Sequence, residues 1–230
     1  DRLFPVFKVA SGDLTFEPLI RAVARTSKPM ILSTGLGTMD EINIAIDWVQ
    51  QEVGSESLRN RLILMHCVSA YPTPMEEANL LSIPYLEKKT GLRTGYSNHV
   101  IGLDASIAAV ALGASVVEVH FTDKKSGRVF RDHELSVEPS ELAKLVEVIP
   151  KIRASLGEYC KKPMICELPN KTATRKGIVA AREIAGDTIL CREDLMYARP
   201  ASEFDSTSVE KLIGKRTIAS ISEGELIWYH

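Results

Sequence analysis

Gly95-Tyr96-Ser97-Asn98-His99 and Glu118-Val119-His120-Phe121-Thr122 are the two stretches that decide the fold of this chain. Each is typical of the carboxyl end of a buried strand, and each ends in or near a histidine. The sequence between them, Leu103 to Gly113, favours a helix, and strand–helix–strand spacing makes the two strands parallel neighbours. We therefore expect His99 and His120 to converge at one edge of a sheet, where two imidazoles indicate a divalent metal site.

A simpler interpretation stays open for either histidine alone. A histidine at a strand end is usually an ordinary polar residue with a satisfied hydrogen bond. The pairing at adjacent strand ends, beside polar Asn98 and Glu118, favours the metal site, because ligating histidines need such partners.

The strand pattern occurs five times, with helical patterns between the strands. The expected strands are largely apolar, as strands buried on both faces must be: Val6–Ser11, Met30–Thr34, Leu62–Cys67, Thr94–His99 and Ser115–Phe121. The expected helices are Pro18–Ser27, a helix opened by the Thr38–Glu41 capping box and ending near Val53, Pro84–Thr90, Leu103–Leu112 and Pro139–Leu156. This alternation predicts an α/β fold with a parallel sheet, as a (β/α) barrel or an open doubly wound sheet. Polar residues at all five strand ends favour the barrel.

The character of the sequence changes after Gly157. Residues 1–157 form the predicted catalytic barrel unit. Residues 158–170 contain two prolines and no clear periodicity, which predicts a linker. Residues 171–230 show short strand patterns and glycine turns, with a weak repeat that starts at Ala181 and again at Ala219, and predict a small β-rich domain.

Composition excludes several classes of protein. The chain has 230 residues, a formal charge of −2 and 45% hydrophobic residues, which is enough for a sizeable core and gives no support for nucleic-acid or membrane binding. No apolar run is long enough for a transmembrane helix, and no Gly-x-Gly-x-x-Gly follows the first strand. The four cysteines match no zinc module and predict reduced thiols in a cytoplasmic protein. Since the chain starts at Asp1 without methionine, we expect a fragment or a processed product.

Three strand-end residues, Lys8, Ser11 and Ser33, indicate an anion site. A lysine on a strand can direct its ammonium group towards the rim. The two serines each precede a glycine-containing turn, where backbone N–H groups can approach a phosphate. Ordinary strand-end turns remain the alternative for each residue alone.

Three further segments are candidates for substrate contacts. Two prolines stiffen the loop Tyr71-Pro72-Thr73-Pro74 after the third strand and orient Tyr71, although the loop could be only structural. Asp132 and His133 are expected on a loop after the fifth strand. The local sequence around Arg199, which a proline follows, predicts a surface residue.

These motifs, in this order, resemble the sialic acid synthase family, which comprises N-acetylneuraminate synthase and its legionaminic and pseudaminic relatives. The matching runs are Phe7 to Asp13, Ile31 to Gly35, Met65 to Pro74, Gly95 to His99, Ala109 to Thr122 and Asp132-His133. The tail from Asn170, with Ala198-Arg199-Pro200, resembles the family's antifreeze-like (SAF) domain. The resemblance implies a partial (β/α)8 TIM barrel, which holds the last five of eight strands and lacks the N-terminal part, followed by a β-clip SAF domain.

The resemblance also implies a role for each matching residue. His99 and His120 match the ligands of a divalent metal, Mn²⁺ or Mg²⁺. The positions that match phosphoenolpyruvate contacts are Lys8, Ser11, Ser33 and Ser97. Three positions match acidic catalytic residues: Asp13 near the sugar and the condensing carbons, Glu118 close to the metal, and Asp132 near the sugar hydroxyls. Tyr71 matches an aromatic residue that lines the acylamino-sugar pocket. Ser69 stands where an asparagine can contact substrate, and Arg199 matches an arginine that enters the partner subunit's site in a domain-swapped homodimer.

The implied reaction is a transferase-type condensation of phosphoenolpyruvate with an N-acyl amino sugar, which forms a nonulosonic acid and releases phosphate by C–O cleavage. Two alternatives stay open: a divalent-metal pyruvate aldolase on the same barrel, and a non-catalytic chain that binds carbohydrate or dimerises. Asn98 stands where the family commonly has aspartate. This departure removes a charge beside a ligand and predicts modest retuning of the metal.

Overall fold

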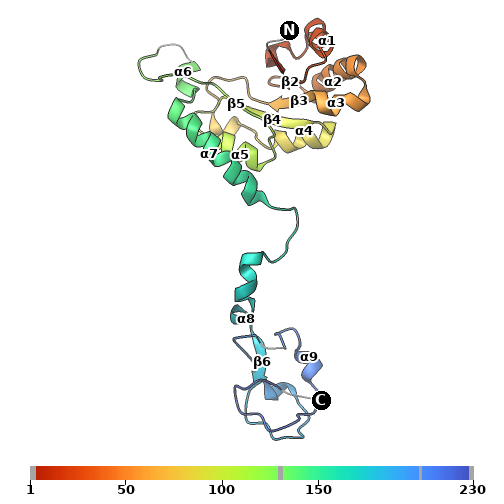
Figure 1. Ribbon diagram of the computed structural model, residues 1–230, viewed down its shortest axis with the longest axis vertical. Coiled ribbons are helices and arrows are strands. Elements are labelled where there is room, and N and C mark those ends of the chain that lie inside the picture. Colours follow the sequence, from red (N-terminus) through yellow and green to blue (C-terminus); the bar gives the residue numbers. More distant parts are fainter. Residues whose placement is uncertain (1–3, 129–131, 202–203, 228–230) are drawn as a thin grey trace. The chain divides into compact units, whose positions relative to one another are not determined.

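The computed structural model describes residues 4–128, 132–201 and 204–227 of the chain. It divides into two compact units, Asp1–Glu158 and Tyr159–His230. The first unit runs from red to green in Figure 1 and the second is mainly blue. Each unit has its own apolar core.

The first unit is built on one sheet of five parallel strands in chain order. The strands are β1 (Phe7–Val9), β2 (Met30–Ser33), β3 (Leu62–His66), β4 (Arg93–Asn98) and β5 (Val117–Val119). All five predicted strands are therefore confirmed. In the register of the last pair, Asn98 lies opposite Val119, so His99 and His120 follow at the same level.

The sheet is curled. The ammonium Nζ of Lys8 on β1 lies 3.3 Å from the carboxylate Oε2 of Glu118 on β5. These strands are at opposite edges of the described sheet, so the two side chains can meet only if the sheet curves into half a barrel. The curvature confirms the barrel alternative over the open doubly wound sheet.

Helices follow the strands, and the five predicted helices are among them. The helices are α1 (Glu17–Ala24), α2 (Met39–Val53), α3 (Ser55–Arg61), α4 (Ser82–Thr90), α5 (Asp104–Ala111), α6 (Asp132–Leu135) and α7 (Pro139–Leu156), with short 3-10 turns at Ser11–Asp13 and Met75–Glu77. The capping box of α2 is confirmed, since Glu41 N–H donates to Thr38 Oγ1 and Thr38 N–H donates to the Glu41 carboxylate. Helix α3 was not predicted, because Leu58 is its single buried residue and leaves no apolar stripe.

Two apolar clusters hold the first unit together. One joins β1–β3 to α1 and α2, with Leu32, Leu64 and Ile20 fully buried. The other joins β4 to α4 and α5 around Tyr96, Ile83 and the small residues of α5. Both clusters lie between the sheet and its helices, which leaves the strand ends available for polar side chains.

The second unit is smaller and has short strands. Strand β6 (Gly177–Ala180) pairs antiparallel with β7 (Leu195–Ala198), and a bridge between Ile184 and Ile221 joins the two segments of the weak repeat. The remaining elements are η3 (Ile165–Asn170), α8 (Lys171–Thr174), η4 (Arg192–Asp194) and α9 (Val209–Leu212). The segment predicted as a linker, 158–170, thus carries the 3-10 helix η3, whose residues are all exposed. Its identity as an SAF domain stays a prediction.

Among the described residues, no helix combines the length and the apolar character needed to cross a bilayer.

Candidate functional site

His99 and His120 lie together at the carboxyl ends of β4 and β5. Their ring centres are 5.3 Å apart and the ring planes are inclined by 66°. Nδ1 of His99 is 2.6 Å from the carbonyl oxygen of Val68 and donates to it, which leaves Nε2 with a free lone pair. Burial lowers the pKa of His99, and the neighbouring His120 lowers it further, so the ring is neutral at physiological pH.

This pair fits a divalent ion. Metal–imidazole bonds are ~2 Å long, so ring centres 5.3 Å apart are close enough for one ion to reach a nitrogen of each ring. No group of three or more His, Cys, Asp or Glu side chains within the described ranges is arranged to hold a metal. The two imidazoles would therefore leave several coordination positions for other ligands.

Tyr71 covers both imidazoles. Its ring centre is 4.2 Å from that of His99 and 5.8 Å from that of His120. The loop that carries it is tied to the same strand end, because Thr73 N–H donates to the carbonyl oxygen of His99 over 2.8 Å. Burial raises the pKa of Tyr71, and electrostatic interactions with Cys67, Asp132 and Glu118 raise it further, so the phenol keeps its proton.

Glu118 joins two other predicted site residues. Ser97 Oγ donates to Glu118 Oε1 over 2.8 Å, and Lys8 Nζ lies 3.3 Å from Oε2. The carboxylate is thus held from β4 and from β1 while it remains partly open to solvent. Ser97 and Glu118 each precede one of the two histidines by two residues on adjacent strands, so they share the face of the sheet from which the histidines project.

A third group surrounds Gly35, which follows β2. Gly35 N–H donates to Ser11 Oγ over 3.1 Å, and that oxygen lies 3.1 Å from the sulfur of Cys67. A Cβ at Gly35 would lie 2.5 Å from Ser69 Oγ and 2.8 Å from Ser11 Oγ, so only glycine leaves room for both hydroxyls. Sequence reasoning missed Cys67 here, although its place between His66 and Ser69 at a strand end was a usable signal.

The other predicted site residues lie at separate positions in the structure. Ser33 is buried at the end of β2, and Asp13 is half-buried in the 3-10 turn after β1. Asp132 begins helix α6 and does not lie on a loop as predicted, because the one-turn helix is too short to leave an apolar period in the sequence. Arg199 is exposed at the end of β7 in the second unit, where it lines a cavity of about 540 Å³ with Pro200 and Glu225 among others.

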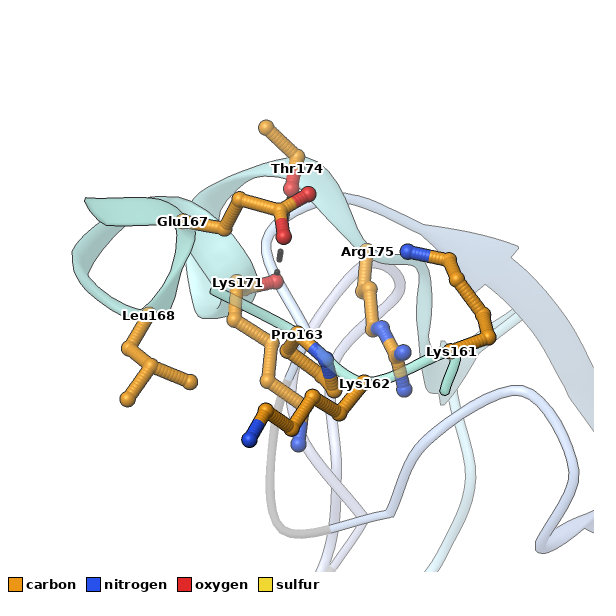
Figure 2. Close-up of a pocket in the computed structure, with 8 residues that line it drawn as sticks. All are labelled: Lys161, Lys162, Pro163, Glu167, Leu168, Lys171, Thr174 and Arg175. Carbon is orange, nitrogen blue, oxygen red and sulfur yellow. Dashed lines mark hydrogen bonds between the residues drawn. The ribbon is translucent and has the colours of Figure 1, made fainter. Parts of the chain in front are cut away.

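A basic pocket of the second unit contains none of the predicted site residues. Figure 2 shows this cavity of about 360 Å³ with the cationic side chains of Lys161, Lys162, Lys171 and Arg175 around it. The Glu167 carboxylate accepts a hydrogen bond from the N–H of Met164 and so caps η3. All the lining residues are exposed, which is typical of a solvated charged surface.

His66, at the end of β3, predicts how stability depends on pH. It is 7% exposed and its Nε2 lies 2.9 Å from the carbonyl oxygen of Ala78. Burial lowers its pKa, so the unfolded chain binds a proton more readily. The stability that neutral His66 contributes is complete above about pH 6.5 and falls as the pH drops below that value. His66→Gln, whose amide can donate to the same carbonyl, should flatten this fall in urea unfolding measured between about pH 7.5 and 5. An unchanged slope in the variant would show that other groups cause it.

Comparison of the sequence with known proteins identifies a family and several relatives. The profile of the NeuB family matches residues 2–161. The chain is 37% identical over 223 residues to N,N'-diacetyllegionaminic acid synthase of Campylobacter jejuni, covering 96% of this chain and 65% of that protein. It is 32% identical over 225 residues to human N-acetylneuraminate-9-phosphate synthase, covering 97% of this chain and 61% of that protein.

A solved structure supports the same relationship. The N-acetylneuraminic acid synthetase of Leptospira borgpetersenii superposes with a TM-score of 0.66 at 34% identity, over 73% of this chain and 56% of that one. The chain thus spans less than two thirds of the length of these relatives. The family profile covers most of the chain, and the resemblance to sialic acid synthases that the motifs predicted is confirmed. The chain therefore belongs to the NeuB family.

Proposed function

We propose that the protein is a transferase-type synthase that condenses phosphoenolpyruvate with an N-acyl amino sugar and releases phosphate, forming a nonulosonic (sialic-type) acid. The observation that carries the proposal is the convergence of His99 and His120 beside the Lys8–Glu118 pair on one curled sheet. Family membership supports it, because the relatives are named as synthases of such acids.

In this proposal His99 and His120 hold the divalent metal, Mn²⁺ or Mg²⁺. When bound, such an ion supplies Lewis-acid polarisation of the aldehyde oxygen of the open-chain sugar. Tyr71 packs against both rings and limits the directions from which a ligand can reach them. Its exposed face offers an amphipathic wall that suits the acylamino group of the sugar.

Phosphoenolpyruvate carries a phosphate and a carboxylate, so its site needs cations and hydrogen-bond donors. Lys8 supplies the cation. The hydroxyls of Ser11, Ser33, Ser69 and Ser97 come from the ends of four strands or the loops after them. Of these, Ser11 is oriented by Gly35 N–H and Ser97 by Glu118. An anionic substrate that binds Lys8 competes with Glu118, which couples substrate binding to the release of this carboxylate.

The acidic residues are assigned to proton movement and to the sugar. The enol carbon attacks the aldehyde carbon, water adds to the resulting cationic centre, and the C–O bond to phosphate breaks. Glu118 is held by two partners at the strand ends, and we assign to it the acceptance of a proton from the added water. Asp132 lies within electrostatic range of Tyr71, whose pKa it raises, and we assign it with Asp13 to the sugar.

The experiment that tests the function is a substrate panel assayed by phosphate release with the full-length gene product. The panel pairs phosphoenolpyruvate with N-acetylmannosamine, its 6-phosphate and a diacetamido hexose. Phosphate release that requires one sugar and added Mn²⁺ supports the proposal. Turnover with pyruvate in place of phosphoenolpyruvate would establish an aldolase. Sugar binding without turnover, even with metal present, would establish a carbohydrate-binding chain.

Arg199 provides a separate prediction about the second unit. We propose that it reaches the acyl group of the sugar in the partner subunit's site of a domain-swapped homodimer. Arg199→Ala should raise KM for the sugar by roughly tenfold, which corresponds to about 1.4 kcal/mol, and leave KM for phosphoenolpyruvate nearly unchanged. Arg192→Ala, which removes another exposed arginine of the same unit, is the matched control and should change neither constant. Equal losses for both substrates in the Arg199 variant would contradict the assignment.

A further inference from the structure

Asn98 precedes His99, and its side chain turns towards the backbone of the following turn. It is 2% exposed. Its Oδ1 accepts hydrogen bonds from Val100 N–H and from the Tyr96 hydroxyl, both over 3.1 Å. Its Nδ2 donates to the carbonyl oxygens of Val100, over 2.9 Å, and Gly102, over 3.3 Å. An amide has two acceptor and two donor sites, so every one is used.

In this chain the hydrogen-bonding partners of Asn98 match an amide and not a carboxylate. Two donors face one end of the side chain and two carbonyl oxygens face the other, which fixes the orientation of Asn98. An aspartate has the same shape but no donor. One of its oxygens would face the carbonyls of Val100 and Gly102, which leaves buried acceptors unpaired and places negative charge against them.

The turn held by Asn98 also holds His99. From the other side, His99 is fixed by the bond from Thr73 N–H to its carbonyl oxygen and by its own Nδ1, which donates to Val68. Tyr96 is buried, with its pKa raised to about 12, so it remains a hydroxyl donor throughout the physiological range. The backbone that carries the His99 ring is therefore constrained on both sides of this residue.

From this geometry we infer that Asn98, supported by Tyr96, is a positioning residue that sets the orientation of His99 for metal binding through the shape of the turn at residues 98–102. The inference rests on the metal site of the proposed function. The change in metal affinity that it predicts is opposite to the change that charge alone would cause. A carboxylate beside a ligand would tighten the binding of a cation by simple electrostatics, whereas disruption of the turn weakens it.

The test measures Mn²⁺ binding to the full-length gene product by titration of free Mn²⁺ with electron paramagnetic resonance. Asn98→Asp and Asn98→Ala should each raise Kd for Mn²⁺ by roughly tenfold or more, within the range typical of residues that orient metal ligands. Tyr96→Phe, which removes one hydrogen bond and keeps the amide, should raise Kd by about twofold to fivefold. Asn79→Asp is the matched control, since it adds the same charge at an exposed position of the first unit, and should leave Kd unchanged.

Each of the following results upholds or overturns the positioning role of Asn98. Binding by Asn98→Asp that equals or exceeds wild type overturns the inference, and if that variant does not fold, an unchanged Kd in Tyr96→Phe overturns it. Thermal unfolding without metal separates loss of fold from loss of affinity. Wild-type binding no tighter than that of His99→Ala overturns both the metal site and this inference. Weakened Mn²⁺ binding in the Asn98 variants of a protein that shows no phosphate release would uphold the positioning role and reject the proposed reaction.

Discussion

Replacing His120 by alanine in the full-length gene product is expected to abolish metal-dependent turnover. His99 and His120 are the pair of imidazoles at the strand ends, and removal of one leaves a divalent ion with a single protein nitrogen from this pair. Since Lewis-acid polarisation contributes several kcal/mol to such reactions, the rate of phosphate release should fall by roughly a thousandfold or more.

The control for this change is His66→Gln, which alters a buried histidine at the end of β3, two strands away from β5 in the sheet. Its Nε2 is already engaged by the carbonyl of Ala78, so turnover should persist. Phosphate release by the wild-type protein that continues at nearly its usual rate in the presence of EDTA would contradict the metal assignment. So would a His120→Ala variant that keeps its rate and its response to Mn²⁺.

Gly95→Ala is expected to have the largest effect on stability. A Cβ at this position of β4 would lie 2.4 Å from Met65 Sδ and 2.7 Å from the carbonyl oxygen of Val116. The methionine can rotate, but the carbonyl belongs to the backbone and accepts the Tyr96 N–H hydrogen bond that joins β4 to the start of β5. The overpacking should lower the free energy of unfolding by about 2–3 kcal/mol in urea titrations.

The same substitution should also weaken Mn²⁺ binding, because it separates the two strands that carry the histidines. Gly12→Ala is the matched control for stability, since no heavy atom lies within 4 Å of the Cβ it would add. Its free energy of unfolding should change by less than about 0.5 kcal/mol. Similar values for the two variants would show that the close approach at Gly95 is relieved without cost.

Most of the fold could be predicted from local sequence. Strands buried on both faces leave apolar runs, and helices such as α7 carry their own boundaries, with Pro139 in the first turn and Gly157 at φ +61° after the last. Strand β5 is shorter than predicted, because Phe121 leaves it to form a bridge with Val137. This pairing depends on a segment that lies further along the chain, so no pattern around Phe121 could indicate it.

The candidate site was predictable in its residues but not in its contacts. The histidine pair followed from spacing, because the register of parallel strands is regular. The meeting of Lys8 and Glu118 depends on the curvature of the whole sheet, which spacing does not specify. The sequence indicates a lost charge at Asn98, and the structure adds that its side chain is bonded to the turn that follows it. The direction of a buried side chain depends on partners that the sequence does not reveal.

The pairing of Asn98 with Val119 has a consequence for insertions and deletions. The hydrogen-bond ladder sets the level of His120 relative to His99, so the length of the connection between the strands does not. Extra residues at the exposed Gly113, between α5 and β5, would lengthen the turn and leave the two imidazoles in place. One residue inserted within Val117–Val119 would direct His120 to the opposite face of the sheet. Natural length variation among related proteins is therefore expected before β5 and not inside it.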